Sequence, residues 1–259
     1  MNNREQQLQA FGKLLDIMDE IRDKCPWDKK QTYESLRHLT IEETYELGDA
    51  ILDNDLPEIK KELGDLLLHI VFYAKIASET KSFDIADVID SINEKLVHRH
   101  PHVFGDIEVE SEEEVAKNWE KLKLKEGRKS ILEGVPKSLP AMVKASRIQD
   151  KAASAGFDWD NLEQVFEKVQ EEISELHHEV NVNNEAKIEA EFGDVLFSLI
   201  NYARFIKVDP ESALERTNKK FIQRFQYIEK ETSKNGLQLS EMTLEEMDIY
   251  WQKSKKHFK

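Results

Sequence analysis

EETYE at residues 42–46 and ELGD at residues 62–65 decide the fold of this chain, because the same pattern returns as EEISE at residues 171–175 and EFGD at residues 191–194. Fifteen residues separate the two acidic groups in both copies, and every matched position is shifted by 129. The residues between the acids differ. A carboxylate pattern that returns with its spacing intact predicts a tandem duplication, and it favours a metal site over a solvated charged surface.

The spacing of the acids is helical. Glu43 and Glu46 are three positions apart and Glu42 and Glu46 four, so their side chains share one face of a helix, as do those of Glu62 and Asp65. Two antiparallel helices can therefore direct four or five carboxylates at one point. Like charges on one helical face cost about 0.2–0.5 kcal/mol per pair unless a cation lies between them. Oxygen ligands in that number suit Mg²⁺ or Mn²⁺ and do not suit zinc.

A lone E-E-x-x-E run is more often a solvent-facing surface than a ligand set. Two observations favour the metal site here. Asp65 directly precedes the largely apolar run 66–72, and Asp194 directly precedes the run 195–200. Both acids therefore lie next to helical segments that we expect to be buried. A buried bare charge is costly and needs a partner. The second observation is the repeat itself.

Composition indicates a helical protein that does not bind nucleic acid or membrane surfaces. The 259 residues include only 9 glycines and 6 prolines, too few turn residues for many short strands. The net charge of −15 disfavours DNA backbones and anionic lipids, which require basic patches. Cys25 is the single cysteine, which excludes an intrachain disulfide. No apolar run reaches membrane-spanning length, so we expect a cytoplasmic location.

Apolar periodicity predicts helices on both sides of a central segment. Their ranges are 6–24, 32–52, 56–78, 84–98 and 111–125 in the first half, and 162–180, 187–206, 210–231 and 243–256 in the second. Pro57 fits a first helical turn and Asp84 fits an N-cap. Glycine and proline are concentrated between residues 126 and 155. We predict an all-α tandem repeat of helical bundles, with an N-terminal domain at 1–125, a linker at 126–155 and a C-terminal domain at 156–259.

Basic residues of the second half are candidate phosphate ligands. Lys220 and Arg224 lie four apart, and Arg offers a planar fork while Lys offers a point charge. Surface ion pairs are an equally common role for such residues. Trp251, one turn before Lys255, either stacks on a base or packs, and packing is the more frequent role of aromatic residues. The matching residues of the first half are Lys95, Arg99, Trp119 and Lys123.

Taken together, these patterns resemble the MazG-type nucleoside triphosphate pyrophosphohydrolases. Further matching stretches occur in the same order, namely CPWD at 25–28, ELGD at 62–65, HRHPHVFG at 98–105 and AGFDW at 155–159. The acidic motif alone is moderately specific, but the ensemble in this order is highly specific. The resemblance covers essentially the whole chain and is to the two-domain members of the family.

The resemblance implies an all-α homodimer that depends on Mg²⁺; the carboxylate donors themselves would also suit Mn²⁺. It implies hydrolysis of ribo- and deoxynucleoside triphosphates to monophosphates and pyrophosphate, with broad base tolerance, as housekeeping of the nucleotide pool. It assigns catalysis to the C-terminal domain. Carried over by position, the catalytic acids are Glu171, Glu172 and Glu175, the metal ligands are Glu172, Glu175, Glu191 and Asp194, and the substrate ligands are Lys220, Arg224, Trp251 and Lys255.

One departure from the family pattern concerns the residue before the second acidic motif. The family often carries a further acid there, whereas this chain has Lys61 and Ala190. The N-terminal copy is otherwise intact, so a second site would use Glu42, Glu43, Glu46, Glu62, Asp65, Lys95, Arg99, Trp119 and Lys123. Two other functions stay open at this point. One is a pyrophosphatase selective for a single nucleotide, and the other is a helical module that senses nucleotide without turnover.

Overall fold

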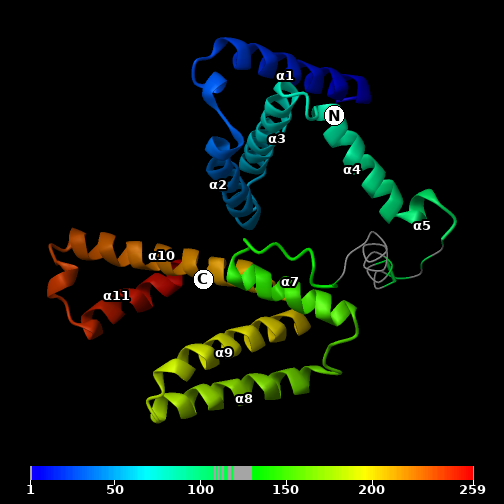
Figure 1. The fold of residues 1–259 in the computed structure, drawn as a ribbon. Helices are drawn as coiled ribbons and strands as arrows, with labels where there is room; N and C mark the ends of the chain where they lie inside the picture. The colour runs from blue at the N-terminus through cyan, green and yellow to red at the C-terminus, as the bar shows by residue number, and fades with distance from the viewer. Residues whose placement is uncertain are drawn as a thin grey trace. The chain divides into compact units, whose positions relative to one another are not determined.

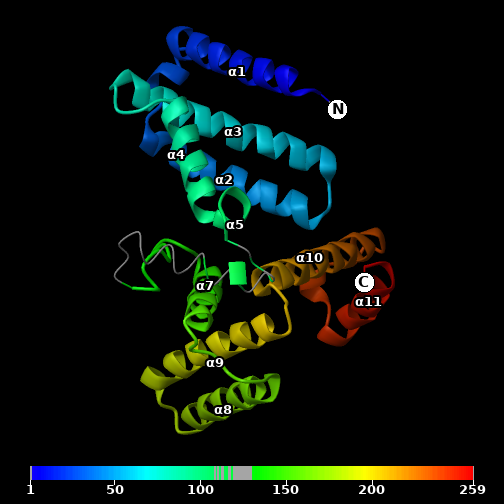
Figure 2. The same cartoon turned by 90° about the vertical axis from the view of Figure 1, so that its right-hand side faces the viewer.

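All regular structure in the described part of the chain is helical, as the sequence predicts. The computed structural model describes residues 2–107, 109, 111, 114–115, 118 and 130–258. The chain divides into two compact units, Met1–Glu110 and Ser111–Lys259 (Figures 1 and 2). No helix among the described residues is long and apolar enough to cross a membrane.

Unit 1 is built on an antiparallel pair of helices. Its elements are α1 (Arg4–Lys24), the 3₁₀ turn η1 (Asp28–Lys30), α2 (Tyr33–Leu52), α3 (Leu56–Glu79), α4 (Ile85–Arg99) and the short α5 (Pro101–Phe104). Helices α2 and α3 lie side by side, and α1 crosses one end of α3 (Figure 1). The core joins α1, α2 and α3 through the buried side chains of Met18, Leu36, Val71, Phe72 and Ile76.

Local hydrogen bonds start these helices where the sequence predicts. The side chain of Thr32 accepts from the Ser35 backbone N–H at the start of α2, and Asp55 caps α3, whose first turn contains Pro57. Asp84 caps α4 as expected, accepting from two backbone N–H groups. A side-chain oxygen at this position satisfies donors that the first helical turn leaves unpaired.

Unit 2 repeats the helical pair and adds a second one. Its elements are α7 (Ala141–Ser154), α8 (Leu162–Asn181), α9 (Glu185–Phe205), α10 (Pro210–Lys234), the 3₁₀ turn η2 (Leu239–Glu241) and α11 (Leu244–His257). Helices α8 and α9 pack along each other, and α10 and α11 form a second pair (Figures 1 and 2). The predicted helices that fall in described residues begin and end within three residues of the observed ones.

The linker predicted at 126–155 contains a helix that the sequence analysis did not expect. Helix α7 begins directly after Pro140, so the glycine and proline residues that indicated a linker all precede it. It packs against α9, which makes it a structural element of unit 2. The predicted domain ends stay predictions. Trp119, Lys123 and most of the helix predicted at 111–125 lie outside the described residues.

The same turn closes the acidic helical pair in both units. Asn54 follows α2 and Asn183 follows α8, and both residues have φ at 55°. Their positions differ by 129, the spacing of the acidic repeat. Asparagine tolerates this left-handed conformation better than most residues. An identical turn sets an identical register of the two helices, and hence of the acids that they carry.

Replacing Asn183 with valine is expected to lower the free energy of unfolding by about 1–2 kcal/mol, because a β-branched residue is strained at positive φ. Glycine at the same position should preserve or raise stability, since it adopts this conformation freely. Urea denaturation followed by circular dichroism measures both variants. Equal stability of the valine and glycine variants would contradict this account of the turn.

Candidate metal and nucleotide site

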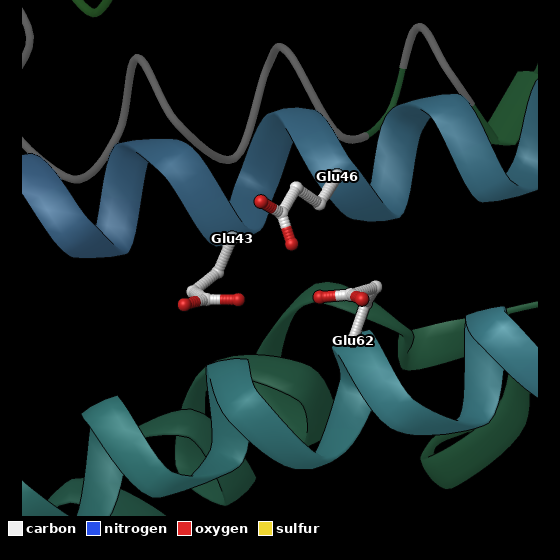
Figure 3. A group of neighbouring side chains, drawn as sticks. All are labelled: Glu43, Glu46 and Glu62. Carbon is white, nitrogen blue, oxygen red and sulfur yellow. The ribbon is translucent and has the colours of Figure 1, made fainter.

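Three carboxylates of unit 1 converge between α2 and α3. Oxygen atoms of Glu43, Glu46 and Glu62 all lie within 4.8 Å of one another. Figure 3 shows Glu43 and Glu46 extending from α2 toward Glu62 on α3. The spacing of three residues places the first two acids on one helical face, and the turn at residue 54 brings α3 opposite that face.

Glu62 is the buried member of this cluster, with 0% of its surface exposed. Its Oε1 accepts from Lys61 Nζ at 2.8 Å, whereas its Oε2 is buried without a hydrogen-bond partner among the described residues. Native structures pair almost all such atoms. A buried carboxylate with one unpaired oxygen, next to two further carboxylates, is an arrangement that can hold a cation.

The pKa values of the three acids reflect their burial and the charges beside them. Burial, followed by the charges of Asp65 and Glu46, raises the pKa of Glu43 above its usual range. Burial and the charge of Glu62 raise the pKa of Glu46. The Lys61 ammonium, in contrast, lowers the pKa of Glu62. These acids are therefore difficult to ionise together unless a cation is bound.

Unit 2 contains the same arrangement. Oxygen atoms of Glu172 and Glu175 on α8 and of Glu191 on α9 all lie within 4.8 Å of one another. Burial, followed by the charges of Glu172 and Glu191, raises the pKa of Glu175. Lys168 Nζ lies 2.7 Å from Glu172 Oε1 and 3.0 Å from Glu171 Oε1. Lys168 thus places one positive charge beside the cluster.

The convergent acids are three of the five predicted in each half. The carboxylates of Glu42 and Asp65 do not belong to the group of oxygens that lie within 4.8 Å of one another in unit 1. The same holds for Glu171 and Asp194 in unit 2. Asp65 still acts on Glu43 through its charge, and Asp194 lines a cavity together with Glu172. The donors are carboxylate oxygens only, which fits a hard divalent cation such as Mg²⁺ or Mn²⁺.

A cavity of about 570 Å³ opens beside the acids of unit 2. It lies between α7, α8, α9 and the loop 156–159, and most of its lining is apolar, including Phe157, Trp159 and Phe197. Glu172, Asp194 and Lys168 provide charged groups in the same cavity. A largely apolar pocket of this size with a few polar groups is the usual form of a small-molecule site.

The AGFDW stretch at 155–159 forms one wall of this cavity. The carboxylate of Asp158 accepts two hydrogen bonds from the guanidinium of Arg204, which ties the loop to α9. Sequence analysis noted the stretch but missed Arg204 and Lys168. Lys168 could have been found, because it precedes Glu171 and Glu172 by three and four positions on a helix. Arg204 is distant in sequence from its partner and carries no such signal.

The predicted substrate ligands lie on other helices. Arg224 on α10 donates from Nε and Nη2 to the Phe258 carbonyl at 3.0 and 2.8 Å, and its guanidinium lies 5.7 Å from the Trp251 ring centre. Trp251 also packs against Phe221, with ring centres 5.3 Å apart. Lys220, Arg224, Trp251 and Lys255 are all described, and none of them lines the cavity. Lys95 and Arg99 of the first half lie on α4.

Comparison with known proteins identifies the family. The model of the MazG nucleotide pyrophosphohydrolase domain matches residues 31–104 and 161–228. The nucleoside triphosphate pyrophosphohydrolase/pyrophosphatase MazG of Thermotoga maritima is 46% identical over 95% of this chain and 95% of its own length. The nucleoside triphosphate pyrophosphohydrolase of Escherichia coli K12 is 43% identical over 96% and 98%, respectively. The chain therefore belongs to the MazG nucleotide pyrophosphohydrolase family and carries one such domain in each half.

Proposed function

We propose that this protein hydrolyses ribo- and deoxynucleoside triphosphates to the monophosphate and pyrophosphate, with broad base tolerance. The observation that carries the proposal is the carboxylate cluster of unit 2 beside a cavity of about 570 Å³. Relatives named as nucleoside triphosphate pyrophosphohydrolases match almost the whole chain, which supports the same reaction.

In this proposal, Glu172, Glu175, Glu191 and Asp194 hold the divalent cation, Mg²⁺ or Mn²⁺. The bound cation would offset the negative charge that develops on the triphosphate during bond cleavage. A water oxygen bonds to the α-phosphorus, the bond from that phosphorus to the α–β bridging oxygen breaks, and pyrophosphate leaves. We assign Glu171 to orient this water and accept its proton, because Glu171 adjoins the cluster without belonging to it.

Lys168 is the positive group best placed to bind the triphosphate. Its ion pairs with Glu172 and Glu171 raise its pKa, so it stays protonated at neutral pH. It also lines the cavity, where its ammonium can donate to a phosphate oxygen. Lys168 would thereby share the phosphate-binding role that the sequence analysis gave to more distant basic residues.

The proposed homodimer offers a place for those distant residues. Large apolar side chains on the acidic helical pair remain exposed in this chain, among them Phe166, Ile173, Phe192, Leu196 and Leu199. Exposed apolar surface on this scale marks an interaction site. We propose that a second copy covers it, and that Lys220, Arg224, Trp251 and Lys255 complete the substrate site in that assembly.

The two halves differ in the position of the lysine that pairs with the acidic cluster. Leu39 stands where the second half has Lys168, and Lys61 stands where it has Ala190. Unit 1 therefore keeps convergent oxygens, including the unpaired Glu62 Oε2, but lacks the lysine on its first acidic helix. We propose that unit 1 binds a cation and that hydrolysis takes place in unit 2.

Glu175→Gln is expected to reduce kcat/KM for ATP with Mg²⁺ by at least about 100-fold, since loss even of an outer-shell partner can cost that much. Glu46→Gln should retain most activity, because it alters only unit 1. Chromatographic separation of nucleotide monophosphate and pyrophosphate measures both. Release of orthophosphate, or full activity of a folded Glu175→Gln protein, would contradict the proposal.

Removing one charge from either cluster should raise the melting temperature of the metal-free protein at pH 7. Folding raises the pKa of Glu46 and of Glu175, so ionisation of these carboxylates opposes folding; this cost begins as the pH rises above their ordinary pKa and is fully present above the raised pKa. The advantage of Glu46→Gln and Glu175→Gln should therefore shrink as the pH falls and these acids take up protons. Scanning fluorimetry in EDTA over a range of pH measures the melting temperatures of the wild type and of both variants.

The matched control is Glu167→Gln, on the exposed surface of α8, which should leave the melting temperature within error of the wild type. Added Mg²⁺ should then raise the melting temperature of the wild type more than that of either cluster variant, because a ligand that binds only the folded state stabilises it. A lower metal-free melting temperature for both cluster variants would argue against repulsion in the clusters.

A further inference from the structure

The cavity of unit 2 contains a hydrogen-bond acceptor that lacks a partner. Gln149 on α7 is only 6% exposed and lines the cavity. Its Nε2 donates to the Phe197 carbonyl on α9 at 2.8 Å, whereas its Oε1 is buried and bonds to no described residue. Buried polar atoms are almost always paired, so this oxygen requires an explanation.

The hydrogen bond to Phe197 determines the orientation of the amide. A backbone carbonyl can only accept, so the NH₂ end of Gln149 must face it and the oxygen must face elsewhere. The oxygen itself is buried and bonds to no described residue. Because the Gln149 side chain lines the cavity, a ligand bound in the cavity is the partner closest at hand for this oxygen.

A second amide in the same cavity has the opposite orientation. Asn201 on α9 also lines the cavity, and its Oδ1 accepts from Arg204 Nε at 3.1 Å and Nη2 at 2.9 Å. A guanidinium can only donate, so it holds the oxygen of Asn201 and leaves the NH₂ group for other partners. Asn201 lies four positions after Phe197, one helical turn beyond the carbonyl that holds Gln149.

We propose that Gln149 and Asn201 form the base-recognition subsite of this enzyme, in which Gln149 accepts from the nucleobase and Asn201 donates to it. Phe157 and Trp159 in the cavity lining provide flat apolar surface for the ring. The proposal rests on the function proposed above, since the triphosphate would lie at the Lys168 and Glu172 side of the cavity.

The pair of amides accounts for broad base tolerance in physical terms. Adenine and cytosine each place an amino donor next to a ring-nitrogen acceptor, and guanine, uracil and thymine each place an N–H donor next to a carbonyl acceptor. Every common base therefore offers the neighbouring donor and acceptor that this subsite matches. A base without a donor on that edge would leave the Gln149 oxygen unpaired, which a site of this kind disfavours.

The test compares ATP with purine-riboside triphosphate, which has the same ring without the amino group. We expect wild-type kcat/KM for ATP to be about tenfold higher, the effect of one neutral hydrogen bond. Gln149→Met should abolish this preference by lowering kcat/KM for ATP. Ile148→Met, a change at a neighbouring residue of the same cavity, should retain it. Equal wild-type rates for the two nucleotides, or a preference that persists in Gln149→Met, would overturn the proposal.

A binding measurement separates this proposal from the proposed reaction. Calorimetry with the α,β-methylene analogues of both nucleotides in Mg²⁺ should show the same tenfold preference without turnover, and inorganic tripolyphosphate should bind wild type and Gln149→Met equally. If the preference is present but no monophosphate is ever formed, the subsite stands and the hydrolytic function falls. If hydrolysis proceeds without any preference, the function stands and the subsite falls. Equal wild-type affinities for the two analogues would overturn the proposal even if a variant does not fold.

Discussion

Electrostatic repulsion among three carboxylates, forced together by two packed helices, is the interaction on which both halves of this protein depend. In each half a turn closed by an asparagine at φ 55° sets the register of the helical pair. That register places acids from the two helices within 4.8 Å of one another. The packing of the helices thus works against the charges that they carry. A bound hard cation, as proposed, would remove this conflict, and the stability of the fold and the proposed chemistry would then depend on the same carboxylates.

The two halves respond differently to the same repulsion. In unit 1 the compensating lysine is Lys61, on the second helix of the pair, and in unit 2 it is Lys168, on the first. Only the second arrangement directs an ammonium group into a cavity lined by Phe157, Trp159 and Gln149. The acidic cluster is present in both units, and in our proposal the position of one lysine distinguishes a unit that holds a cation from a unit that binds a nucleotide as well.

Much of this architecture follows from local rules. The predicted helices that fall in described residues begin and end within three residues of the observed ones, and in each unit the acidic repeat identifies the two helices whose acids converge. Helix α7 was not predicted, because the glycine and proline residues that precede it suggested a linker. Its packing against α9, which the sequence does not reveal, makes it part of unit 2. Trp251 contacts Phe221 and Arg224, so within this chain it has the packing role that the sequence analysis considered more frequent.

The sequence by itself determined the helices of the two acidic pairs, their duplication and the helical face that carries the acids, because spacings of three and four residues act within a single helix. Only the tertiary structure decided which acids converge, since that depends on how each helix is rotated about its axis against its partner. It also decided that Gln149 and Asn201 share a cavity with Glu172. Those residues come from three different helices, and no local pattern in the chain records their distance in space.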